Sequence, residues 1–139
     1  MWQEIYSGCR ELDGEEHEDT LIAANNYAGA LRDLRRFEEA KSLLRKTMPV
    51  TRRVLGENHH VTLRMRWAYA IALYKDEGAT PDDLREAVAT LEETERIARR
   101  VFGGAHPLAV DILQYLRDAR AALSTHEDVG SISDAVGAL

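Results

Sequence analysis

The residue types best suited to chemistry in this sequence are two adjacent histidines, His59 and His60, which follow the residues Gly-Glu-Asn. Imidazole nitrogens bind transition metals and transfer protons near neutral pH. The stretch therefore raises two alternatives. It is either a metal or catalytic site, or a turn between two helices.

The same stretch occurs elsewhere in the chain. Residues 14–31 read GEEHEDTLIAANNYAGAL and residues 56–73 read GENHHVTLRMRWAYAIAL, with nine of eighteen positions identical at an offset of 42. A third, shorter copy, GGAHPLAV, occupies residues 103–110 at an offset of 47. A period of this length is typical of proteins built from one supersecondary unit per repeat.

The repetition bears on what the histidines can do. His17, His59 and His106 occupy the same place in the three copies. Equivalent positions in stacked helix pairs lie about 16–20 Å apart, whereas zinc–nitrogen bonds are only ~2 Å long. These three side chains cannot share a metal, so we expect turn residues that cap or pack between units. We expect no metal site and no cofactor.

The segments between the copies have the spacing of amphipathic helices. Apolar and small residues recur at steps of three and four, which marks one face of a helix. They are Phe37, Ala40, Leu44, Thr47, Thr51 and Val54, and then Leu84, Ala87, Leu91, Thr94, Ala98 and Val101. Alternating strand patterns and Asn-Gly hairpins are absent from the sequence. The predicted fold class is all-α, an antiparallel helix-pair solenoid of about two and a half repeats.

The repeat boundaries follow from the copies. We predict a half repeat over 1–14, repeat 1 over 15–56, repeat 2 over 57–103 and a terminal capping helix over 104–123. The last helix is expected to be a cap with one wet face, because Arg117 and Arg120 stand at positions that are apolar in the earlier copies. Thr80 and Pro81 are expected to begin the second helix of repeat 2. The polar residues 124–139 are predicted to form a weakly ordered tail.

Several positions that recur together resemble the tetratricopeptide repeat. They are Tyr27, Ala28, Leu31, Ala40 and Leu44 in the first unit, and Tyr69, Ala70, Leu73, Ala87 and Leu91 in the second. The 42-residue period, the His-x-x-Thr-Leu opening and the Val-Leu-Gly close resemble the kinesin light chain variant of that family. The likeness covers residues 1–123. It implies a tetratricopeptide-like superhelix that acts in protein–protein interaction.

Composition and charge exclude other classes. The chain carries 45% hydrophobic and 30% charged residues, a lone Cys9, and no apolar run near the ~18–20 residues that span a membrane. Residues 32–75 have a balance of +7, but the whole chain is at −6, and nucleic-acid binders carry a basic domain. We therefore expect a cytoplasmic protein without a membrane or nucleic-acid partner.

Catalytic motifs are missing as well. Cys9 aligns with small residues on a buried stripe, where thiols are inert. The pairs Glu38–Glu39 and Asp82–Asp83 fall in first turns of predicted helices, where acids complement the helix dipole. Neighbouring residues on a helix do not face each other, as paired catalytic carboxylates must. The sequence predicts that the protein is not an enzyme.

A ligand site is predicted on the first helices of the repeats. In the family that this chain resembles, an extended peptide commonly lies along these helices on the concave side. The corresponding residues here are Asn25, Asn26, Gly29, Arg32, Arg64, Trp67, Ile71 and Lys75. Asparagine amides bond both peptide backbone groups, and arginines attract carboxylates, so we expect an acidic, aromatic-containing peptide. A core position for Trp67 remains the alternative.

A second function class is assembly. The first helix is expected to expose the face that a preceding helix would cover, with Trp2, Ile5 and Tyr6 at or beside it. Uncovered apolar ends of solenoids favour stacking. The alternative function is therefore an assembly segment of a longer array, or self-association through this N-terminal helix face.

Overall fold

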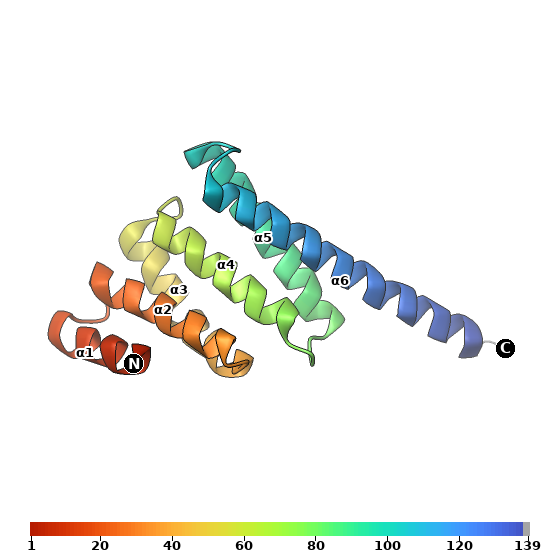
Figure 1. The fold of residues 1–139 in the computed structure, drawn as a ribbon, viewed down its shortest axis with the longest axis horizontal. Helices are drawn as coiled ribbons and strands as arrows, with labels where there is room; N and C mark the ends of the chain where they lie inside the picture. The colour runs from red at the N-terminus through yellow and green to blue at the C-terminus, as the bar shows by residue number, and fades with distance from the viewer. Residues whose placement is uncertain (138–139) are drawn as a thin grey trace.

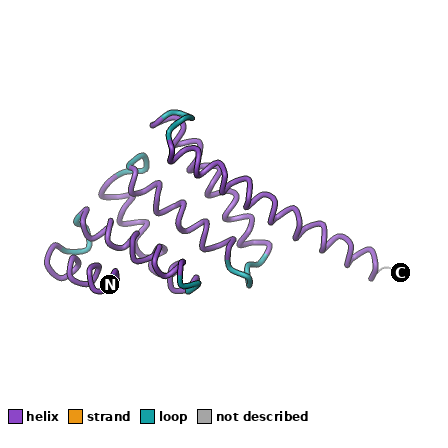
Figure 2. Tube along the Cα trace, viewed as in Figure 1, coloured by secondary structure: helices purple, strands orange, loops and turns teal. Residues whose placement is uncertain are grey.

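The computed structural model describes residues 1–137, with side chains described for residues 1–127. These residues form six helices and no strand (Figures 1 and 2). The helices are α1 (Trp2–Asp13), α2 (Glu18–Asp33), α3 (Phe37–Leu55), α4 (His60–Lys75), α5 (Pro81–Phe102) and α6 (Pro107–Gly137). The predicted fold class, an all-α solenoid of helix hairpins, is confirmed.

The helices stack in sequence order. Each helix contacts the next one along the chain, and α4 also contacts α2 and α6. In Figure 1, α2, α4 and α6 lie in one layer, and α3 and α5 lie behind them. The central position of α4 explains its composition, because twelve of its sixteen residues are buried. A helix that is covered on most sides must be apolar or small around most of its circumference.

Each turn into the front layer is built the same way. A glycine with φ of 91°, 95° or 93° ends the preceding helix, a backbone conformation that favours glycine; these are Gly14, Gly56 and Gly103. Three residues later a histidine side chain accepts a backbone N–H through Nδ1 at 3.1 Å. The donors are the amides of Asp19, Val61 and Leu108. The expectation that the repeated histidines are capping turn residues is confirmed.

The small residues mark where helices approach closely. Ala28 and Ala40 are each 1% exposed, and Ala70 and Ala87 are fully buried. Larger side chains at these places would push the paired helices apart, since cores have little free volume. The recurrence of alanine in both repeats therefore reflects packing between the helices of each pair.

The longer connection between α4 and α5 ends in a capping box. The amide of Asp83 donates to Oγ1 of Thr80 at 3.1 Å, and the Thr80 amide donates to Oδ2 of Asp83 at 3.0 Å. Pro81 takes the first helical position, where its missing N–H costs nothing. The predicted start of this helix at Thr80 and Pro81 is confirmed.

Helix α6 differs from the prediction at its C-terminal end. Arg117 and Arg120 are exposed, and Arg120 pairs with Glu92 of α5 at 3.3 Å, so one face of α6 is wet. The helix continues past the predicted boundary at residue 123 and ends at Gly137. Residues 124–137 contain no proline, and a glycine inside a helix costs only about 1 kcal/mol, which weakens the helix without ending it. Positions 138 and 139 of the predicted tail lie outside the described residues.

Candidate functional site

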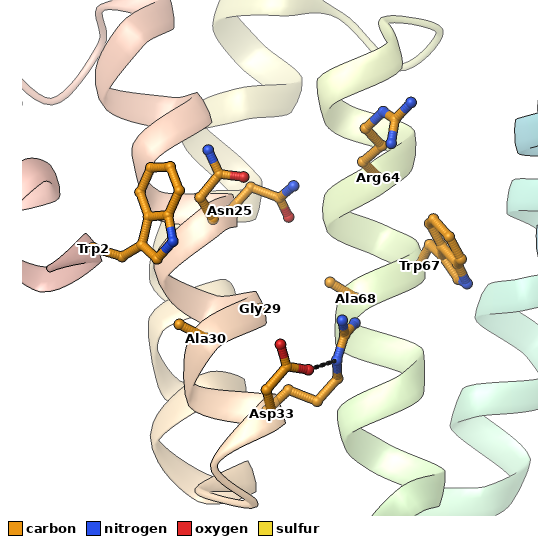
Figure 3. A pocket seen from close by; sticks show the side chains of 10 residues that line it. Trp2, Asn25, Gly29, Ala30, Asp33, Arg64, Trp67 and Ala68 are labelled. Carbon is orange, nitrogen blue, oxygen red and sulfur yellow. Dashed lines mark ion pairs between the residues drawn. The ribbon is translucent and has the colours of Figure 1, made fainter.

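A hollow of about 300 Å³ lies between α2 and α4 (Figure 3). Six of the eight residues predicted to bind a peptide line it: Asn25, Asn26, Gly29, Arg32, Arg64 and Trp67. Trp2, Ala30, Asp33 and Ala68 complete the lining. We call this space the α2–α4 groove.

Small residues keep the groove open. Gly29 and Ala30 contribute little or no side chain from α2, and Ala68 faces them from α4 in Figure 3. A Cβ atom built on Gly29 would meet nothing within 4 Å. Gly29 is therefore not required by a close helix contact, and its effect is to leave room between the two helices.

The groove contains polar groups that the described residues do not satisfy. Oδ1 of Asn25 is buried and has no hydrogen-bond partner among the described side chains and backbone. Arg64 is exposed and forms no ion pair with any described residue. Nε of Arg32 lies 3.8 Å from Oδ1 of Asp33, a long contact that holds it only loosely (Figure 3). A buried acceptor without a donor costs about 1–3 kcal/mol.

Trp67 belongs to two environments. Its side chain is half-buried and meets Tyr115 of α6 edge-on, with ring centroids 5.4 Å apart. Figure 3 shows the ring on the side of α4 away from Asn25. Its Nε1 is buried without a partner in the described part of the chain. Trp67 thus packs between α4 and α6 while it borders the groove, so both alternatives for this residue hold in part.

A second hollow adjoins the first. It has a volume of about 260 Å³ and shares Arg32 and Asp33 with the α2–α4 groove. The remaining predicted residues, Ile71 and Lys75, line it together with Tyr115. Ile71 is only 4% exposed, so it offers little surface to a ligand. Nζ of Lys75 lies 5.5 Å from the centroid of the Tyr74 ring.

The family comparison covers the helices that form the groove. Residues 19–78 match the tetratricopeptide repeat. The match spans α2, α3 and α4, less than half of the 139 residues, and supports a tetratricopeptide repeat protein. No curated protein matches the sequence. Tetratricopeptide repeats generally mediate protein–protein interactions and are typically non-catalytic. No helix of the described residues is long and apolar enough to cross a membrane.

The histidines of the turns can be tested as metal ligands. Glu18, His59 and His60 offer ligand atoms within 4.8 Å of one another. However, Nδ1 of His59 accepts the Val61 N–H, so the proton of a neutral ring sits on Nε2, 3.6 Å from Oε1 of Glu18. A metal at Nε2 would displace that proton and require Nδ1 to be protonated, which would break the cap. The cluster serves the turn.

Trp2 and Tyr6 do not lie where the repeat alignment placed them. Trp2 was predicted at the self-association face, but it is half-buried and borders the α2–α4 groove beside Asn25. Tyr6 was predicted beside the open face, and this placement is wrong. It is 7% exposed and faces Tyr27 of α2 with ring centroids 6.1 Å apart. The repeat alignment could not show this, because Trp2 aligns with the core residue Leu44, which gives no sign of a groove position.

Proposed function

We propose that this chain is a non-catalytic interaction module that binds an extended peptide along the α2–α4 groove and the adjoining hollow. The observation that carries the proposal is Arg64, which is exposed, forms no ion pair among the described residues and lines the same hollow as the amide side chains of Asn25 and Asn26. A peptide backbone supplies N–H donors and a carboxylate side chain supplies the anion. One extended ligand therefore satisfies both groups.

The cations favour an acidic ligand with an aromatic residue. Arg32, Arg64 and Lys75 bring positive charge to the two hollows, and Asp33 is the acid that lines both. Trp2 and Trp67 border the space, and the ring of Trp2 provides apolar surface for an aromatic side chain. Electrostatic attraction of this kind weakens as salt is added.

The test is fluorescence anisotropy with dye-labelled acidic peptides that contain one aromatic residue, because a dye on the peptide avoids signals from the two tryptophans. We expect Asn25→Ala and Arg64→Glu each to weaken binding about tenfold or more. Arg96→Glu is the matched control, since Arg96 is an exposed arginine of α5 outside both hollows. Equal losses in all three variants, or none, would contradict the proposal.

The same proposal extends to the repeat type, the location in the cell and the absence of enzymatic activity. The 42-residue period and the His-x-x-Thr-Leu opening favour a repeat of the kinesin light chain type. The single Cys9, which has no second cysteine in the chain with which to pair, favours a reducing, cytoplasmic location. We also propose that the chain has no enzymatic activity and requires no cofactor.

A second candidate function is assembly through α1. Met1, Ile5 and Leu12 are 82%, 40% and 87% exposed, and their spacing of four and seven residues places them on one side of the helix. We propose that the wet face of α6 from a second copy covers this side, because exposed Glu4 and Glu11 on α1 complement Arg117 there. Because the two faces are different, each copy that binds leaves an α1 face free at one end of the assembly and an α6 face free at the other, so further copies can add.

Sedimentation velocity over a hundredfold concentration range tests assembly. We expect the sedimentation coefficient to rise with concentration and Leu12→Glu to abolish the rise. Arg64→Glu separates the two functions, because it should weaken peptide binding and leave sedimentation unchanged. A wild-type chain that sediments as a monomer throughout would exclude this candidate and leave the peptide groove untouched.

A further inference from the structure

A third hollow lies on the opposite side of α4 from the peptide groove. It has a volume of about 280 Å³ and is walled by α3 and α5, with Arg66 and Tyr69 of α4 at its floor. Two residues rotate about 200° around a helix. Arg66 and Tyr69 therefore point away from the side where Arg64 and Trp67 border the groove. Occupation of one space does not block the other.

The wall formed by α3 is cationic. Arg45 and Arg52 are seven residues apart, which places them on one side of the helix two turns from each other. The side chain of Arg52 has no hydrogen-bond or ion-pair partner among residues 1–127. Arg45 uses only Nε, which donates to the hydroxyl of Tyr69 at 3.2 Å. The terminal nitrogens of both guanidiniums remain open to a ligand.

The floor residue Arg66 is already neutralised. Its side chain is 9% exposed, and its two terminal nitrogens lie 3.4 Å from Oε2 of Glu57 and 2.9 Å from Oε2 of Glu93. A buried guanidinium needs such partners, because an uncompensated charge in the interior is strongly unfavourable. Arg66 therefore acts as a fixed, polar floor. It does not add to the free positive charge of the hollow.

One carboxylate opposes the two open arginines. The Tyr69 hydroxyl donates to Oε1 of Glu86 at 3.0 Å, and Glu86 is the acid that lines this hollow. Arg66 with its two carboxylate partners has a net charge of −1, so Arg45 and Arg52 together offset this charge and that of Glu86. The attraction for an anion therefore comes from the open terminal nitrogens of the two guanidiniums and not from an excess of positive charge. Met48 and Pro49 lie between the two arginines on the same wall and supply apolar surface. The hollow thus has the cationic side chains of Arg45 and Arg52 at its edge and the apolar side chains of Met48 and Pro49 on its wall.

We propose that this hollow binds an oxyanion carried on a short apolar stem, a carboxylate or a phosphate ester presented by a partner. The oxyanion lies between the guanidiniums of Arg45 and Arg52, which bind such groups in bidentate fashion. The stem rests on Met48 and Pro49. The site is independent of the peptide groove, so a partner can engage both faces of α4, or two partners can bind at once.

Two-dimensional NMR of the full chain, which resolves arginine Nε–H signals, tests this site with small probes. The probes are phenyl phosphate and phenylacetate, with benzyl alcohol as the uncharged control. We expect saturable shifts of the Arg45 and Arg52 signals with one or both anions and none with benzyl alcohol. Shifts with phenyl phosphate alone would assign a phosphate ester, and shifts with phenylacetate alone would assign a carboxylate.

Variants give the decisive readout. Arg52→Gln should weaken anion binding about tenfold, as expected for the loss of a charge-assisted hydrogen bond. Glu86→Gln should strengthen it, because the opposing charge is removed while the hydrogen bond from Tyr69 can remain. Arg96→Gln, an exposed arginine of α5 outside this hollow, should leave it unchanged. The proposal is overturned if neither anion shifts the two signals, or if Arg96→Gln weakens binding as much as Arg52→Gln.

Discussion

Nδ1 of His59 accepts the backbone N–H of Val61 at 3.1 Å, and the same bond recurs at His17 and His106. A side-chain acceptor at the N-cap satisfies one of the amides that a helix start leaves without a partner. The repeated histidine of this chain is therefore a helix cap that the solenoid uses once for each helix of the front layer.

Replacing this cap should destabilise the chain. We expect His59→Ala to lower the free energy of unfolding by about 1 kcal/mol, whereas His59→Asp should retain most of it, because aspartate is also a favoured N-cap. Urea unfolding followed by circular dichroism measures both. The control is His60→Ala, since His60 is exposed and makes no capping bond. A loss at His60 equal to that at His59 would show that the cap is not the cause.

Two glycines should respond to alanine with opposite signs. Gly56 has φ of 95°, so Gly56→Ala is strained and should cost about 1–2 kcal/mol. Gly29 sits in the interior of α2, where a Cβ meets nothing within 4 Å. Gly29→Ala should therefore stabilise the chain by about 0.5–1 kcal/mol. Thermal unfolding of the two variants and of wild type shows whether each variant is more or less stable than wild type.

Gly29→Ala also separates stability from ligand binding. The added methyl group enters the α2–α4 groove, so peptide affinity should fall while the melting temperature rises. Gly8→Ala in α1 provides the comparison, because its Cβ also meets nothing within 4 Å and Gly8 does not line the groove. A loss of peptide affinity in Gly8→Ala would mean that glycine flexibility, rather than groove space, controls binding.

Much of this fold could be read from the sequence because it repeats. Identical residues at an offset of 42 fix the turns, and alanines at equal places in both units fix the close helix contacts. The residues that were misplaced lie in the first and last helices, where the aligned positions of the copies hold different residue types, such as Trp2 against Leu44. Tyr6 turns toward Tyr27, Trp2 reaches the groove, and α6 continues past residue 123. A periodic pattern gives the face of a helix, but not which neighbour a large ring meets.

The groove residues could also be predicted from helical spacing, which gives the face of the helix on which a residue lies but not what it contacts. Helical spacing places Asn25, Gly29 and Arg32 on one side of α2. Helical spacing does not show that Ile71 is only 4% exposed or that the ring of Trp67 packs edge-on against Tyr115. Those outcomes depend on the distance between α4 and α6, which is set by side chains from both helices.

The capping box of α5 makes a pH-dependent contribution. The backbone hydrogen bond from Thr80 holds the pKa of Asp83 below its ordinary value. A carboxyl whose pKa is lower in the folded state stabilises the fold at neutral pH, and that stabilisation is lost as the pH falls through the folded pKa. We expect Asp83→Ala to be less stable than wild type at pH 7, with the difference shrinking below about pH 4. Urea unfolding at several pH values checks this, and a constant difference would contradict it.

Two tyrosines of α4 that are buried to a similar degree should behave in opposite ways when the hydroxyl is removed. Tyr69 and Tyr74 are 7% and 9% exposed. The Tyr69 hydroxyl accepts from Arg45 and donates to Glu86, whereas the Tyr74 hydroxyl is buried without a partner in the described residues. Burial, together with the charge of nearby Asp118, raises the pKa of Tyr74, so its hydroxyl remains protonated and desolvated.

Removing a buried hydroxyl that has no partner relieves a desolvation penalty, while removing a bonded one leaves its partners unsatisfied. We therefore expect Tyr74→Phe to raise the free energy of unfolding by about 1 kcal/mol and Tyr69→Phe to lower it by about 1–2 kcal/mol. Both variants keep the ring, so packing is matched. Urea unfolding of the pair is the measurement, and destabilisation of Tyr74→Phe would mean that this hydroxyl has a bonding partner in solution.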